Sequence, residues 1–93
     1  RRYINDLQDE NSQVRINGAK LLKVYGNQNS VKPLLTGLAD SNYQVRLHSV
    51  KALAEIGDKR VIDHLDQARK RKEEIKVVKE ALKDAIEHLK ELP

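Results

Sequence analysis

The sequence predicts an all-α protein, an α-solenoid in which successive pairs of helices stack on one another. Two observations lead to this prediction. A pattern of residues recurs after 31 positions, and within each repeat the apolar residues follow the spacing of an amphipathic helix. A period of about 20–50 residues is typical of arrays in which each unit buries its apolar face against the next.

The repeat is visible when residues 9–26 are compared with residues 40–57. Both stretches place an Asp six residues before an Arg, contain Gln-Val-Arg and close on Gly. The matched pairs include Leu7 and Leu38, Asp9 and Asp40, Arg15 and Arg46, Leu22 and Leu53, and Gly26 and Gly57. We therefore expect a partial repeat at 1–8, repeats at 9–39 and 40–71, and a last segment at 72–93.

Each repeat is expected to contain two helices. Ser12 and either Ser41 or Asn42 are candidate N-caps of the two first helices, which end at Gly26 and Gly57. Gly57 suits a left-handed turn. In the second repeat, two adjoining apolar stripes indicate a helix with more than one neighbour: Val45, Ala52, Leu53 and Ile56 form one, and Leu47, Val50 and Ala54 form the other.

The second helices are shorter. Ser30 and Asp58 are their candidate caps, ahead of apolar residues that include Leu34 and Leu65. Tyr3, Ile4 and Leu7 match the apolar positions of such a helix, so the chain opens inside one. Because no initiator Met is present either, we expect a fragment of a longer chain.

A long helix is expected at about residues 73–91. Its main apolar residues have heptad spacing: Ile75, Val78, Leu82, Ala85, Leu89 and Leu92. Three interpretations of this helix stay open. It is the first helix of a diverged third repeat, a cap on the solenoid, or one helix of a coiled-coil dimer. The seam is shorter than the three to four heptads that a coiled coil needs, which favours packing on the solenoid and a monomer.

These residues strongly resemble the HEAT repeat, and most closely the short variety found in phycobilin-lyase-like proteins. The resemblance rests on Asp-x5-Arg with Val before the Arg, and on Leu-x-x-Ile-Gly-Asp-x-Arg. It implies a right-handed α-solenoid of about two full repeats with partial flanking ones. It also implies a ladder of salt bridges and hydrogen bonds through Asp9, Arg15, Asp40 and Arg46. Since the last segment lacks a matching Asp and Val-Arg pair, we expect the ladder to end at Arg46.

Composition argues against catalysis and against bound cofactors or metals. The chain has no Cys and three His, and the His spacing does not form His-Glu-x-x-His. Its four Gly residues are isolated, so none belongs to a phosphate-binding loop. Apolar runs are too short to cross a membrane, and we expect a soluble, cytoplasmic protein without catalytic residues.

A protein partner is the leading expectation for function. The resemblance implies that partners bind the face lined by the second helices. There the 31-residue register forms two mixed polar columns, Arg1, Lys32 and Asp63 in one, and Asn5, Thr36 and Gln67 in the other. Neither column carries an aromatic anchor, so the interface is expected to be modest.

Two alternatives stay open. A net charge of +4 and the basic run Arg69, Lys70, Arg71 and Lys72 suggest contacts to the phosphates of a nucleic acid. In the alternative, purely structural interpretation, that run is a charged helix end or a turn. The chain could also be a non-catalytic part of a HEAT-like lyase or modification enzyme.

Overall fold

The computed structural model describes residues 2–93, so Arg1 lies outside the described residues. That range contains six α-helices, one short 3₁₀ helix and no strand, which confirms the all-α prediction. The elements are α1 (Arg2–Asp6), α2 (Ser12–Tyr25), α3 (Gln28–Gly37), α4 (Tyr43–Ile56), the 3₁₀ helix η1 (Lys59–Val61), α5 (Ile62–Arg69) and α6 (Lys76–Glu91).

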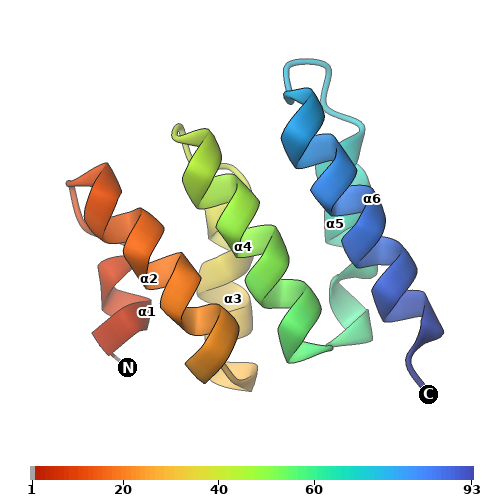
Figure 1. Cartoon of the computed structure of the whole chain (residues 1–93), viewed down its shortest axis with the longest axis horizontal. Helices are drawn as coiled ribbons and strands as arrows, with labels where there is room; N and C mark the ends of the chain where they lie inside the picture. The colour runs from red at the N-terminus through yellow and green to blue at the C-terminus, as the bar shows by residue number, and fades with distance from the viewer. Residues whose placement is uncertain (1) are drawn as a thin grey trace.

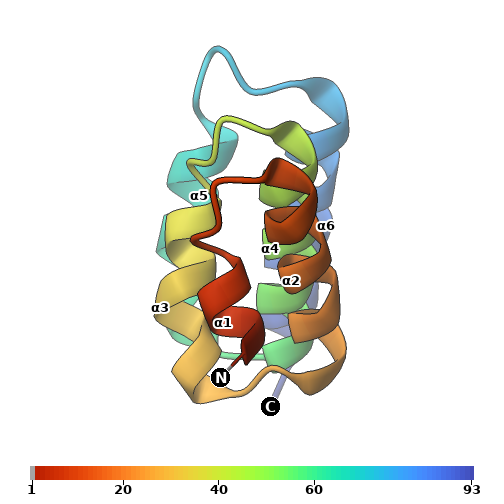
Figure 2. The same cartoon turned by 90° about the vertical axis from the view of Figure 1, so that its left-hand side faces the viewer.

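The helices lie in two layers. Helices α2, α4 and α6 stand side by side in a first-helix layer, and α1, α3 and α5 form a second-helix layer behind it (Figures 1 and 2). Helix α2 packs against α4 and α4 against α6, while α1, α3 and α5 pack against α2, α4 and α6 in turn. This arrangement confirms the predicted α-solenoid, which measures 32 × 30 × 16 Å.

One apolar cluster fills the space between the layers. It extends from Leu7, after α1, to Leu89 on α6, and it is built from Leu, Ile, Val and Ala. Leu34, Leu53 and Leu65, from α3, α4 and α5, are each 1% exposed or less. Burying a side chain of this size stabilises the fold by about 1.5–3 kcal/mol, so these positions of the 31-residue repeat hold the stack together.

The first-helix caps are asparagines. Asn11 caps α2 and Asn42 caps α4, and each side-chain Oδ1 accepts a hydrogen bond of 2.8 Å from the backbone N–H two residues on. The prediction of Ser12 as a cap was therefore wrong by one residue, whereas Asn42 was one of the two predicted candidates. Asn is as good an N-cap as Ser, so with Asn11 as the cap Ser12 becomes the first residue of the helix.

The second helix of the first repeat begins earlier than expected. Asn27 caps α3, with its Oδ1 accepting from Asn29 N at 2.9 Å. Ser30, the predicted cap, instead lies three residues into the helix and accepts from Asn27 N at 3.2 Å, which completes a capping box. Asp58 caps η1, the short turn that continues into α5, through a 2.9 Å bond from Arg60 N.

The two glycines that end the first helices have different roles. Gly57 has φ 79°, so the left-handed turn predicted there is present. Gly26 has φ −73° and is extended, which any residue can adopt. Glycine is required at position 26 because a Cβ would collide with the carbonyl oxygen of Leu22.

Small residues allow the two layers to approach closely. A Cβ on Gly18 of α2 would lie 2.9 Å from the Cβ of Asp6 on α1. In the corresponding contact of the next repeat, the glycine is on the second helix. Gly37 of α3 faces Ser49 of α4, and a Cβ on Gly37 would collide with Ser49 Oγ. Each contact thus contains one glycine, contributed by the first-helix layer in one repeat and by the second-helix layer in the next.

Helix α6 begins at Lys76, three residues later than the sequence suggested. Its heptad seam faces inward, because Val78, Leu82, Ala85 and Leu89 are each 4% exposed or less and belong to the apolar cluster. Helix α6 packs on both α4 and α5. These four seam residues are therefore covered within the chain, whereas Ile75 is 41% exposed.

Candidate interaction surfaces

Arg15 joins the first repeat to the second. Its Nε lies 2.9 Å from Asp40 Oδ2, and its Nη2 lies 3.2 Å from Asp40 Oδ1. Its Nη1 donates to the carbonyl oxygens of Asp9 and Glu10 at 2.9 and 3.1 Å. Both partners of the ion pair are about 15% exposed. A bidentate, partly buried pair of this kind also fixes the two loops that precede α2 and α4.

Arg46 makes the corresponding contacts one repeat later. Its Nε and Nη2 each lie 3.0 Å from an oxygen of Glu74, and its Nη1 donates to the carbonyl oxygens of Asp40 and Ser41. The Glu74 side chain is only 2% exposed. The expectation that the ladder ends at Arg46 was therefore wrong, because Glu74 supplies the next carboxylate.

The sequence comparison did not find Glu74 because its position relative to the start of α6 differs from that of Asp40 relative to the start of α4. Asp40 stands two residues before the cap of its helix, and its Oδ1 accepts from Asn42 N at 2.8 Å. Glu74 stands next to the cap residue Ile75 and accepts from Ile75 N at 2.9 Å. The extra methylene of Glu reaches the same Arg from a shifted residue. A carboxylate shortly before the last helix was the available signal.

The first carboxylate of the series binds only its own loop. Asp9 Oδ1 accepts from Asn11 N at 2.8 Å, as Asp40 does from Asn42 N. No side-chain cation lies within ion-pair distance of Asp9 among residues 2–93. Among the four predicted ladder residues, Arg15 forms an ion pair with Asp40 and donates to the carbonyl oxygen of Asp9. Arg46 donates to the carbonyl oxygen of Asp40, but its ion-pair partner is Glu74.

The residues proposed from the second-helix face lie where the register placed them. Asn5 is on α1, Lys32 and Thr36 are on α3, and Asp63 and Gln67 are on α5, and all five are exposed. The sixth, Arg1, lies outside the described residues. We call the described five the second-helix face. It is polar, and it lies on the outer side of the second-helix layer.

The basic run is largely occupied by contacts within the chain. Arg69 Nη2 and Lys70 Nζ lie 2.7 and 3.1 Å from the carboxylate of Asp66. Arg71 Nη1 donates to the carbonyl oxygen of Leu38 at 2.9 Å, which ties the loop before α6 to the end of α3. Lys72 is exposed. The run therefore forms a helix end and a turn, which agrees with the purely structural interpretation.

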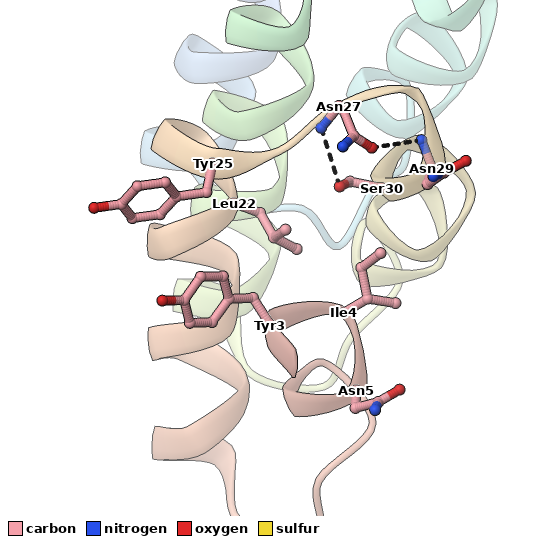
Figure 3. A pocket seen from close by; sticks show the side chains of 8 residues that line it. All are labelled: Tyr3, Ile4, Asn5, Leu22, Tyr25, Asn27, Asn29 and Ser30. Atoms are coloured by element: carbon pink, nitrogen blue, oxygen red, sulfur yellow. Dashed lines mark hydrogen bonds between the residues drawn. The ribbon is translucent and has the colours of Figure 1, made fainter. Parts of the chain in front are cut away.

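Figure 3 shows a hollow at the end of the stack where the chain begins. Tyr3 and Tyr25 line one side with ring centroids 5.8 Å apart, and Asn27, Asn29 and Ser30 line another. The hollow has a volume of about 560 Å³. Asn27 Oδ1 and Ser30 Oγ accept hydrogen bonds in the capping box of α3. Sequence reasoning did not bring these two tyrosines together.

A second concave surface was also not expected. It is a groove between α4 and α6 with a volume of about 490 Å³, and none of its lining residues belongs to α1, α3 or α5. His48 also lies on α4 but does not line the groove. Burial, followed by the charges of Lys20, Lys51 and Lys23, lowers its pKa below the usual value. These three lysines therefore lie close enough to His48, at the seam between α2 and α4, to act on its charge.

No group of three or more His, Cys, Asp or Glu residues within residues 2–93 could hold a metal ion. In the same range, no helix has the length and apolar character needed to cross a membrane.

The fold and its Arg-to-carboxylate contacts define a helical-repeat protein of the solenoid class. A comparison with known protein families matches HEAT repeats over residues 3–91. Because the match covers nearly the whole chain, the protein belongs to the HEAT-repeat family. A search of curated proteins gives no match.

Proposed function

We propose that this protein is a non-catalytic scaffold module that binds another protein through the second-helix face. The supporting observation is that the repeated Arg side chains are bonded within the chain, whereas the polar side chains of the second-helix face are exposed. Arg15 and Arg46 use their donors on the chain itself, whereas the side chains of Lys32 and Thr36 are exposed and form no hydrogen bond or ion pair to another helix among residues 2–93. The repeat thus presents a row of free polar side chains on a rigid support.

The same reasoning extends to the repeat boundaries. We propose repeats at 9–39 and 40–71, a partial one at 1–8, and a diverged third repeat at 72–93 whose first helix is α6. This division is supported by the place of α6 beside α4 and by the Arg46–Glu74 ion pair that joins them. The Asp-x5-Arg motif also favours the phycobilin-lyase-like variety, in which case the chain would be a non-catalytic part of such a protein.

Paired capture tests the proposed face. Wild-type protein and the Lys32→Glu/Thr36→Arg variant are immobilised, and the proteins they retain are compared by quantitative mass spectrometry. We expect the variant to lose partners that the wild type holds, because both changes lie on α3 at the centre of the face and reverse or add charge.

The matched control is Lys83→Glu/Gln13→Arg, which makes the same charge changes at exposed positions of the first-helix layer. It should retain the partners. Unchanged capture by the α3 variant, or equal loss in both variants, would place the interface elsewhere.

Nucleic-acid binding is the less favoured alternative, since Arg69, Lys70 and Arg71 already bind groups of the chain. It predicts an affinity that falls steeply with salt concentration. Titration of a labelled duplex at low ionic strength decides the question. Absence of binding under these conditions would exclude this alternative. Binding by the wild type that is lost in Lys72→Ala would support it.

A further inference from the structure

The α4–α6 groove has an apolar floor. Its apolar lining residues are Leu47, Val50, Ala54, Val77, Ala81 and Ala85. Val77 is 48% exposed, and Leu47 and Ala54 are half-buried. Residues 77 to 88 of α6 border the groove, a rise of about 17 Å or three helical turns. The floor is therefore long enough for a short helix, and its alanines leave room for that helix to approach closely.

The two walls of the groove carry opposite charge. On the α4 side stand Lys51 and, from the neighbouring α2, Lys23; on the α6 side stand Glu80 and Asp84. Neither of these lysines is in an ion pair within residues 2–93. At the end nearest the C-termini of α4 and α6, Glu55 and His88 complete the rim.

The opposite charges of the two walls can be traced to equivalent positions on the first helices. Lys20 and Lys51 occupy equivalent positions one period apart on α2 and α4. When the first helices are aligned on their caps, the equivalent position on α6 is Asp84. The diverged last helix thus turns a basic face into a groove with a basic wall and an acidic wall.

We propose that the α4–α6 groove binds an amphipathic helix of a partner protein, with carboxylates along the edge that faces Lys51 and cations along the edge that faces Asp84. The apolar ridge of that helix covers Leu47, Ala54 and Ala81. This surface lies on the first-helix layer, so it is separate from the second-helix face, and its failure would leave the proposed function above untouched.

Shape and charge together select this occupant. A ridge with two differently charged edges fits the groove, as in other helix-in-groove complexes. A second copy of this chain fits less well, because two grooves placed face to face leave both floors uncovered. An extended segment would place side chains alternately up and down, and it would cover the floor with only half of them.

Synthetic helices of about 18 residues provide the probe. One, the mixed-edge peptide, has Leu along its ridge, Glu along one edge and Lys along the other. A second, the Lys-edge peptide, has the same ridge and Lys on both edges. Dissociation constants are measured by fluorescence anisotropy at low ionic strength with the full chain. Exchanging the edges would be no control, since a helix can reverse its direction in the groove.

We expect wild-type protein to prefer the mixed-edge peptide. In the Lys51→Glu variant the new carboxylate joins Glu55 on the α4 side and leaves only Lys23 basic there, so the preference should reverse in favour of the Lys-edge peptide. Each peptide's affinity should change by roughly threefold to tenfold, the effect of one or two exposed ion pairs. Ala81→Gln, which places a longer neutral side chain on the floor, should weaken both peptides by at least about tenfold.

The Lys32→Glu/Thr36→Arg variant of the second-helix face should bind both peptides as the wild type does. Methyl NMR shifts on binding should appear at Ala54 and Ala81. A preference that does not reverse in Lys51→Glu, or shifts confined to α1, α3 and α5, would overturn the proposal. Equal binding of a mixed-edge peptide interrupted by proline would point to an extended ligand. Sedimentation showing a dimer that Ala81→Gln abolishes would assign the groove to a second copy.

Discussion

Arg46 and Glu74 are held together across 28 residues of sequence by a nearly buried, bidentate ion pair. The same Glu74 carboxylate accepts the backbone N–H of Ile75, where α6 begins. The pair therefore connects the loop before α4, the helix α4 and the start of α6. It repeats the geometry of Arg15 and Asp40 one period earlier.

Removal of the Glu74 carboxylate should destabilise the protein. Glu74→Ala leaves the Nε and Nη2 groups of the partly buried Arg46 without their carboxylate and the N–H of Ile75 without its acceptor, and we expect a loss of about 1–3 kcal/mol. Urea unfolding measures it. The neighbouring Glu73 is exposed and makes no ion pair among the described residues, so Glu73→Ala should change stability by less than about 0.5 kcal/mol. Equal losses in the two variants would contradict this role of Glu74.

Asp9 and Asp40 are equivalent in sequence but should differ in their contribution to stability. The Asp40 carboxylate binds Arg15 and the N–H of Asn42, whereas the Asp9 carboxylate, within residues 2–93, binds only the N–H of Asn11. We expect Asp40→Ala to cost about 1–2 kcal/mol more than Asp9→Ala. Chemical unfolding of the two variants side by side provides the measurement. A larger loss from Asp9→Ala would show that sequence position, rather than the Arg contact, sets the cost.

Two buried serines should respond in opposite directions to alanine. The Oγ of Ser49 is buried and has no hydrogen-bond partner in residues 2–93, so Ser49→Ala should raise the free energy of unfolding by about 1 kcal/mol. Ser30 is 2% exposed, but its Oγ accepts from Asn27 N in the capping box. Ser30→Ala should therefore lower stability by about 1 kcal/mol. Destabilisation by both substitutions would indicate that Ser49 has a partner.

The basic seam between α2 and α4 should be visible in the titration of His48. Burial and the charges of Lys20, Lys51 and Lys23 lower its folded pKa below the ordinary 6.5. Between the folded pKa and 6.5 the unfolded chain binds more protons, so the contribution of neutral His48 is complete above 6.5 and declines as pH falls through that interval. His48→Gln should remove this part of the pH dependence.

NMR titration checks the cause of the shift. Lys51→Gln should raise the pKa of His48 towards its ordinary value, because one of the three lysine charges is removed. Lys83→Gln, on the exposed side of α6, is the matched control and should leave it unchanged. A His48 pKa that is unchanged in Lys51→Gln would mean that burial and the other two lysines, Lys20 and Lys23, cause the shift.

The repeat register was enough to predict the layers and most of the core. Leu22 and Leu53, or Leu34 and Leu65, are equivalent by sequence and are buried at equivalent places. The register could not identify Asn27 as a cap, since local Asn geometry, rather than apolar spacing, decides where α3 begins.

The remaining features depend on how separate helices meet. Glu74 was missed because the loop before α6 has a different length from the loop before α4, and a longer side chain compensates for the shift. The α4–α6 groove was missed because Lys51 and Asp84 become opposite walls only when the two helices are placed side by side. Helical periodicity describes one helix at a time, so it does not contain this information.

The melting temperature of Arg46→Ala tests most directly the claim that the repeated Arg residues hold the helix pairs together. Loss of the contacts to Glu74, Asp40 and Ser41 should cost about 1–3 kcal/mol and lower the melting temperature by at least about 4 °C. An unchanged melting temperature, together with lost affinity for a captured partner, would contradict the account and make Arg46 a binding residue.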